Sequence, residues 1–85
     1  WRLPLFEPYM VKLHSDVANL CNASLDGMAG AITAALFLKE FLKFPVSSWV
    51  HIDTFAWSSG SILSTKGAAL QGLDIMIDFL ENNYQ

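Results

Sequence analysis

The stretch from residue 28 to residue 43 most constrains the fold, because it is apolar on nearly every side. It runs through alanine, leucine and phenylalanine, and its only charged residues, Lys39, Glu40 and Lys43, come in its last turns. The two lysines suit the negative C-terminal end of a helix dipole. The pattern predicts a helix over residues 28–43, and a helix that is apolar nearly all round has to be covered nearly all round.

The first half of this predicted helix has small residues on one face. Gly27, Ala31 and Ala35 lie four residues apart, with Gly30 and Ala34 beside them. Residues at this spacing share one side of a helix, so another segment of backbone can approach closely there. We interpret the small face as packing and not as chemistry.

The composition also indicates that other structure covers this chain. Of its 85 residues, 53% are apolar and only 15% are charged, whereas an average soluble domain has roughly 25% charged residues. Folding at this length removes only about 60 to 65% of the unfolded surface from water. We therefore expect the chain to be part of something larger, and a first residue that is Trp1 rather than methionine agrees with a trimmed start or a piece of a longer chain.

Several functional classes are excluded by the same figures. Abundant apolar residues and a net charge of only −3 are the opposite of intrinsic disorder. The absence of a basic run argues against nucleic acid or an anionic membrane as a partner. The central uncharged run, residues 27–38, is shorter than the roughly 20 apolar residues of a membrane span. Since Cys21 cannot form an internal disulfide, we expect a cytoplasmic protein.

The elements before the apolar helix are short. Pro8 suits the first turn of a helix, which we predict over residues 7–14. Residues 17–21 form a short apolar run between polar residues, which predicts a strand covered on both faces. Residues 22–30 contain Asn, Ser, Asp and Gly, which predicts a loop.

After the apolar helix, residues 49–55 alternate and predict a second strand, followed by a loop over residues 57–61. An amphipathic surface helix is predicted from residue 66 or 67 to residue 82. The order is α-β-α-β-α, and two strands make a poor independent sheet. The fold class is therefore α/β, and we expect a partial layered segment of a larger domain with a mixed sheet.

His51 and Asp53 are the most tempting chemical pair, because alternation in a strand sends both side chains to one face. A metal site needs three or four ligands, and the other candidates, His14 and Cys21, lie on separate elements. We interpret His51 and Asp53 as making structural hydrogen bonds. Cys21, in an apolar run without a basic neighbour, is interpreted as a buried structural residue.

The remaining patterns carry little chemistry. Gly27 and Gly30 lack the Lys-Ser/Thr of a phosphate-binding loop. The serines at 58, 59, 61 and 64 have no nucleophile-elbow context, and Asp74 and Asp78 are most simply a solvated helix face. We therefore predict no catalytic residue and no metal ligand in this sequence.

The order of the segments carries more information than any single residue. Nearly the whole chain resembles the C-terminal stretch of the catalytic domain of the leucine aminopeptidase (cytosol aminopeptidase) family, through segments in matching order and spacing: WRLPLFEPY at 1–9, VANL at 17–20 followed by Asn22, GAITAALFLKEF at 30–41, WVHID at 49–53 and KGA at 66–68.

The resemblance implies a cytoplasmic, homohexameric metalloaminopeptidase that removes N-terminal residues from peptides with two divalent cations, Mn²⁺ or Zn²⁺. In that family the metal-binding and catalytic residues all lie before the W-R-L-P-L stretch. None can be carried over to this sequence. We therefore expect residues 1–85 to be a fragment of the catalytic domain that is inactive alone and needs the remainder of that domain as its partner.

One part of the family's substrate site falls within the sequence. His51-Ile52-Asp53 matches the start of the H-L-D-I-A-G strand end beside the S1 pocket, and the continuation Thr54-Phe55-Ala56 departs from I-A-G. The resemblance therefore makes Thr54, Phe55 and Ala56 candidates for a wall of this pocket, with a structural role as the alternative. For the whole chain, the alternative function is a non-catalytic assembly or oligomerisation module.

Overall fold

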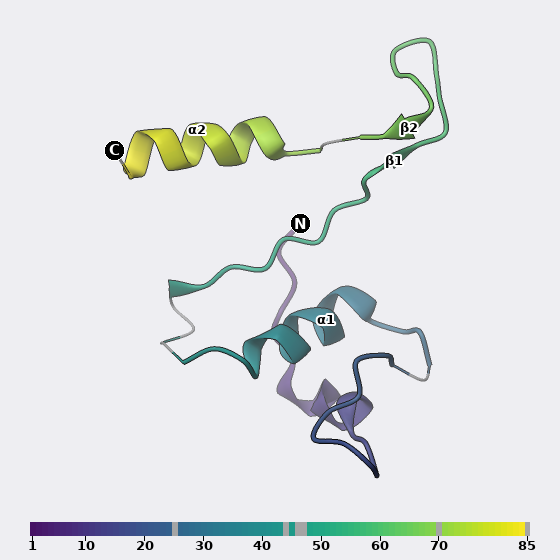
Figure 1. Cartoon of the computed structure of the whole chain (residues 1–85), viewed down its shortest axis with the longest axis vertical. Helices are drawn as coiled ribbons and strands as arrows, with labels where there is room; N and C mark the ends of the chain where they lie inside the picture. Colours follow the sequence, from purple (N-terminus) through teal and green to yellow (C-terminus); the bar gives the residue numbers. More distant parts are fainter. Residues whose placement is uncertain (25, 44, 46–47, 70, 85) are drawn as a thin grey trace. The chain divides into compact units, whose positions relative to one another are not determined.

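The computed structural model describes residues 1–24, 26–43, 45, 48–69 and 71–84. Leu25 and Leu70, which fall in the predicted loop and the predicted last helix, lie outside these ranges. The chain divides into unit 1, Trp1–Ile52, and unit 2, Asp53–Gln85. Figure 1 shows the elements in chain order: the 3₁₀ helix η1 (Glu7–Leu13), the helix α1 (Gly30–Lys39), the strands β1 (Trp57–Ser58) and β2 (Gly67–Ala68), and the helix α2 (Leu73–Asn83).

Helices combined with a small two-stranded sheet confirm the predicted class, a partial α/β segment. Among the described residues, no helix has both the length and the apolar content that a membrane span requires.

The first predicted helix is confirmed as η1, with 3₁₀ geometry. Proline stands in its first turn, where the missing N–H costs no hydrogen bond. The backbone N–H of Tyr9 donates to the carbonyl of Phe6 at 2.9 Å, and the two rings meet edge to face with centroids 4.8 Å apart. At the other end, His14 turns extended and donates its N–H to the carbonyl of Val11. The helix therefore closes after two short turns.

The apolar helix is confirmed as α1, but it is shorter than predicted at both ends. Ala29 precedes it with a left-handed backbone, φ 58°, a conformation that non-glycine residues rarely adopt. At its C-terminus, Phe41 and Leu42 donate to carbonyls only three residues back. Such bonds tighten the last turn toward 3₁₀ geometry. The prediction missed both ends because an apolar run continues past the helix without a local signal.

The core of unit 1 lies where α1 packs against η1. Its buried side chains are Leu13 from η1 and Thr33, Ala35 and Leu36 from α1. The buried hydroxyl of Thr33 donates to backbone carbonyls one turn earlier in α1. An ion pair between Lys39 and Glu7 joins the end of α1 to the start of η1. The packing interpretation of the small face is confirmed at Ala35, whereas Gly27, Gly30 and Ala34 are exposed.

The strand predicted over residues 17–21 is wrong. The chain bends there, and Val17 is 97% exposed. The Ser15 hydroxyl accepts the N–H groups of Val17 and Ala18, and Cys21 donates its N–H to the carbonyl of Leu13 at 2.8 Å. A strand exists only when a neighbouring strand completes its ladder, and the described part of unit 1 offers none.

The strand predicted over residues 49–55 is also wrong as a paired element. These residues carry no ladder hydrogen bonds, and the stretch crosses the boundary between the two units. The rings of Trp49 and His51 stack, with centroids 6.1 Å apart and an interplanar angle of 11°. Residues two apart share one side of an extended backbone. Trp49 and His51 therefore alternate with Val50 as predicted, but no described strand of unit 1 pairs with them.

Unit 2 contains a hairpin where the sequence predicted a loop and the beginning of a helix. The strands β1 and β2 are antiparallel, with Trp57 opposite Ala68 and Ser58 opposite Gly67. Gly67 has φ 140°, which lies outside the helical region, so the last helix cannot begin at this residue. It begins after Gly72, whose left-handed φ of 79° is accessible to glycine.

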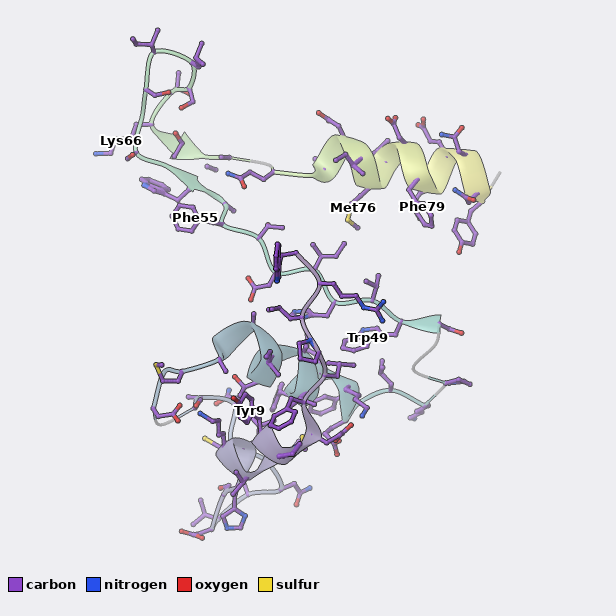
Figure 2. All side chains as sticks on the ribbon, turned by 180° about the vertical axis from the view of Figure 1, so that it is seen from behind. Tyr9, Trp49, Phe55, Lys66, Met76 and Phe79 are labelled. Atoms are coloured by element: carbon purple, nitrogen blue, oxygen red, sulfur yellow. The ribbon has the colours of Figure 1, made fainter. Side chains whose placement is uncertain are left out.

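The last helix is confirmed as α2, with its start displaced to Leu73. That it packs on a surface through its apolar side stays a prediction. None of its residues is buried. Met76 and Phe79 project to the same side of α2 (Figure 2). At its end, the rings of Phe79 and Tyr84 meet edge to face. Its apolar side chains therefore stay in solvent, since none of the described residues of unit 2 is buried.

Candidate functional site

The predicted pocket wall, Thr54, Phe55 and Ala56, lies in unit 2 immediately before β1. All three residues are exposed, and the side chain of Phe55 is 71% exposed. Figure 2 shows Phe55 on the segment that leads into the hairpin. The carbonyl of Ala56 accepts the N–H of Ala69 at 2.9 Å, which extends the hairpin by one bond. Within unit 2 the three residues form an open surface with one end anchored to the hairpin.

The tempting pair His51 and Asp53 is divided between the units, with His51 in unit 1 and Asp53 in unit 2. The half-buried ring of His51 stacks on Trp49. That His51 and Asp53 make local structural hydrogen bonds stays a prediction. Stacking on an indole ring fixes the orientation of an imidazole without giving it a proton partner.

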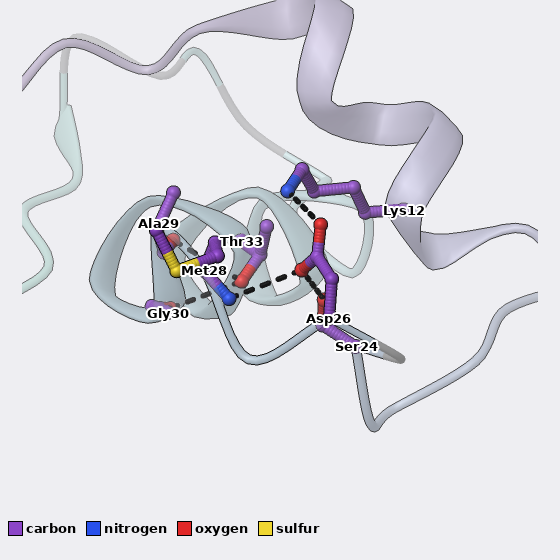
Figure 3. Close-up of polar contacts among 7 residues, drawn as sticks. All are labelled: Lys12, Ser24, Asp26, Met28, Ala29, Gly30 and Thr33. Carbon is purple, nitrogen blue, oxygen red and sulfur yellow. Dashed lines mark hydrogen bonds and ion pairs between the residues drawn. The ribbon is translucent and has the colours of Figure 1, made fainter.

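An ionic cluster that sequence reasoning missed surrounds Asp26 (Figure 3). One carboxylate oxygen accepts the N–H of Met28 and the hydroxyl of Ser24, each at 3.0 Å, and the other pairs with the ammonium of Lys12. The Lys12 side chain first, then the Met28 N–H and the Ser24 hydroxyl, lower the pKa of Asp26 from 3.8 to about 2. A carboxylate held this way is a weak base, so the cluster is structural.

The cluster fixes the loop before α1 onto η1. Lys12 belongs to η1, and Asp26 lies four residues before α1. The ammonium of Lys12 also lies 5.1 Å from the centroid of the Tyr9 ring, which is within the range of a cation–π contact. The sequence could have predicted the contact between Asp26 and Met28, because an aspartate whose carboxylate accepts an N–H two residues later forms a common turn. No sequence pattern indicated the contact with Lys12, which lies 14 residues away.

Cys21 and the hairpin serines make local contacts of a structural kind. The half-buried thiol of Cys21 donates to the carbonyl of Ala23 at 3.0 Å. The Ser64 hydroxyl lies 2.9 Å from that of Ser58 and 3.0 Å from that of Ser61. Because these groups bond to one another and to nearby backbone, we assign them to the stability of the loop and the hairpin turn.

Unit 1 also carries an open groove of about 690 Å³ that the sequence did not indicate. The rings of Phe37 and Phe41 lie beside each other in its lining, with centroids 5.1 Å apart. Its polar groups are one carboxylate and two amides, which gives little convergent chemistry. The groove is lined by Asn19, Leu20, Asn22, Phe37, Glu40 and Phe41.

The residues present do not fit a metal centre. Throughout the ranges that the structure describes, no three side chains of His, Cys, Asp or Glu come together as a set that could hold an ion. A catalytic zinc needs three protein ligands and a structural one needs four. The two divalent cations implied by the resemblance therefore have no ligand set among these residues, and no step of a reaction is assigned to such ions here.

Comparison with known proteins gives one consistent result. Residues 1–77 match the model of the cytosol aminopeptidase family, catalytic domain. The chain is 36% identical over its whole length to a probable cytosol aminopeptidase of Rickettsia bellii, and 42% identical over 96% of its length to a cytosol aminopeptidase of Buchnera aphidicola. The crystal structure of the cytosol aminopeptidase from Coxiella burnetii superposes on the whole chain with a TM-score of 0.80 and 44% identity.

These matches define a segment of a peptidase catalytic domain. The chain belongs to the cytosol aminopeptidase family, as its order of segments predicted. It spans 18% of the Rickettsia protein, 16% of the Buchnera protein and 19% of the Coxiella chain. Over a shorter stretch of 53 residues, identity to a probable cytosol aminopeptidase of Chlamydia caviae reaches 55%.

Proposed function

We propose that residues 1–85 are the C-terminal part of the catalytic domain of a cytoplasmic leucyl aminopeptidase, a hydrolase that removes N-terminal residues from peptides with the help of two divalent cations. One observation carries the proposal. The whole chain superposes on the Coxiella cytosol aminopeptidase with a TM-score of 0.80 at 44% identity. Similarity in sequence and in backbone over the same residues supports a shared function and not only a shared fold.

Apart from one wall of the substrate pocket, the proposed contribution of this chain is structural, and the chain alone is inactive. The described residues offer no metal ligand set, and the strongly held carboxylate of Asp26 ties a loop to η1. The residues that hold the cations, Mn²⁺ or Zn²⁺, and those that act on the peptide belong to the part of the enzyme that this chain does not span. That remainder is the chain's partner, and the complete enzyme is a homohexamer.

A contact with substrate is proposed for Thr54, Phe55 and Ala56. They directly follow His51-Ile52-Asp53, the motif that the resemblance places beside the S1 pocket. The exposed ring of Phe55 offers an apolar surface to the side chain of a leucine-like N-terminal residue. The bond between the carbonyl of Ala56 and the N–H of Ala69 anchors this short segment to the hairpin.

A non-catalytic assembly module is the second candidate. It is favoured by the extent of apolar side chains left in solvent, among them Ile62 and Leu63 at the tip of the hairpin and Ile75 on α2. Such surface marks an interaction site in a folded protein. An assembly module needs this surface and no peptidase chemistry.

The two candidates are separated by an activity assay on leucyl p-nitroanilide with Mn²⁺. We expect hydrolysis by the complete parent enzyme that carries this segment and none by the 85-residue chain alone. A correctly folded but inactive parent would support the assembly module and contradict the first proposal. In the active parent, Phe55→Ala should raise KM for the leucyl substrate more than it lowers kcat. An unchanged KM would remove Phe55 from the pocket wall.

A further inference from the structure

Two aromatic residues, Phe55 and Trp57, form a pair where the hairpin of unit 2 begins. The antiparallel ladder of β1 and β2 continues back to Ala56, whose carbonyl accepts the N–H of Ala69 at 2.9 Å. The backbone from Phe55 to Trp57 is therefore extended, and residues two apart in an extended backbone point to the same side. The two rings consequently project from one side of the hairpin, and the methyl group of Ala56 projects from the other.

Unit 2 leaves both rings in solvent. The side chain of Phe55 is 71% exposed and that of Trp57 is 51% exposed. Figure 2 shows the ring of Phe55 projecting from the segment that leads into the hairpin. The residue opposite Trp57 in the ladder is Ala68, whose methyl group is too small to cover an indole. The backbone hydrogen bonds of the hairpin therefore hold an uncovered aromatic pair in place.

The spacing of the pair favours a flat occupant. Side chains in a strand stand roughly perpendicular to the sheet, and two residues along the strand are about 7 Å apart. Carbon atoms pack best at about 3.5 Å or slightly more. One aromatic ring can therefore lie between Phe55 and Trp57 with a face toward each, whereas a branched aliphatic side chain is too thick. Aromatic rings also attract one another beyond the area that they bury.

The position of the pair along the chain connects it to the substrate. Phe55 belongs to the segment proposed above as a wall of the S1 pocket, and Trp57 follows on the same side of the backbone. We propose, resting on that function, that Trp57 is a further specificity-determining residue of this pocket. Peptides with an aromatic N-terminal residue are the preferred substrates, and the aromatic ring of that residue enters between Phe55 and Trp57.

The test uses the complete parent enzyme and the ratio of kcat/KM for phenylalanyl p-nitroanilide to that for leucyl p-nitroanilide. Both substrates carry the same leaving group, so the ratio reports only the N-terminal side chain. We expect a ratio above one. Trp57→Leu keeps an apolar side chain but removes the ring, and should lower the ratio about two- to tenfold. Trp57→Phe should restore most of it. Ile62→Ala, at another exposed apolar residue of the hairpin, is the control and should leave the ratio unchanged.

An unchanged ratio in Trp57→Leu would overturn the proposal. So would an equal loss of kcat/KM for both substrates, which is the result of a packing role, or an active parent without the aromatic preference. Calorimetric binding of L-phenylalaninamide and L-leucinamide separates this proposal from the proposed function. A folded but inactive parent that binds phenylalaninamide more tightly, and loses this difference in Trp57→Leu, would support the aromatic pair and contradict the peptidase function. Equal binding of the two amides would overturn the aromatic preference whatever the activity.

Discussion

Units 1 and 2 are built from different elements and are stabilised differently. Unit 1 packs α1 on η1 and buries Leu13 and Leu36 between them. Unit 2 joins β1 to β2 by backbone hydrogen bonds and buries none of its described residues. Apolar burial is the dominant favourable term in folding, so the comparison indicates that unit 1 has a core of its own and that unit 2 depends on what covers it.

Truncating one apolar side chain in each unit tests this difference with the largest expected change in stability. Leu36 is fully buried, at 0% exposure, so Leu36→Ala should destabilise unit 1 by about 2 to 5 kcal/mol. For a core this small, that amounts to loss of the folded unit. Leu80→Ala on α2 removes a half-exposed side chain and should cost less than about 1 kcal/mol. Urea titration followed by circular dichroism measures both, and equal effects would contradict the difference between the units.

The entries to the two helices allow a finer comparison. Each helix follows a left-handed residue, Ala29 before α1 and Gly72 before α2. Gly72→Ala meets no steric obstacle, but the left-handed backbone should cost about 1 kcal/mol and reduce the helix signal of α2 at 222 nm.

The reverse change, Ala29→Gly, relieves a similar strain but increases the entropy of the unfolded chain. We expect a net effect below about 0.5 kcal/mol. Circular dichroism compares the two variants. If Ala29→Gly reduced the helicity of α1 as much as Gly72→Ala reduces that of α2, the left-handed residue would not determine where either helix begins.

The cluster around Asp26 should make unit 1 sensitive to acid. The pKa of this carboxyl is lowered from 3.8 to about 2 in the folded chain. A lowered folded-state pKa means that the stabilisation is present above pH 3.8 and is lost as the pH falls toward 2. Asp26→Asn should remove this part of the pH dependence. The midpoint of acid unfolding, followed by circular dichroism, tests it, and an identical acid transition in the variant would exclude Asp26 as the cause.

The smallest effect is expected in the hairpin turn. Ser64→Ala removes the exposed hydroxyl that contacts Ser58 and Ser61. The backbone bond from the N–H of Ser61 to the carbonyl of Ser64 remains, so the change should be within about 0.5 kcal/mol. Amide hydrogen exchange at Ser61 measures it. Complete loss of protection there would show that side chains, not backbone, hold the turn.

The helices and the family could be predicted from the sequence, and the strands could not. Helical signals are local: Pro8 marks the start of η1, and the spacing of Leu73, Met76 and Leu80 marks α2. A strand requires a partner, and the apolar run at 17–21 remains unpaired among the described residues. The hairpin was missed for the same reason, since pairing of Trp57 with Ala68 is a non-local contact.

The same contrast between local signals and non-local contacts applies to the candidate site. The sequence motif at 51–53 pointed to Thr54, Phe55 and Ala56, whose contact with substrate stays a proposal. The pair of Lys12 and Asp26 and the groove beside Phe37 arise from segments distant in the chain. No periodicity or local motif encodes such contacts, because they depend on how α1 settles on η1.

The central claim is tested most directly with a chimaera in which this chain replaces its counterpart in the Coxiella aminopeptidase. Its hydrolysis of leucyl p-nitroanilide is measured in the presence of Mn²⁺. The chain is 44% identical to the segment it would replace and superposes on it with a TM-score of 0.80. If it is a working part of an aminopeptidase catalytic domain, the chimaera hydrolyses the substrate while the isolated chain does not. A folded chimaera without activity, beside an active unmodified Coxiella enzyme, would contradict that claim.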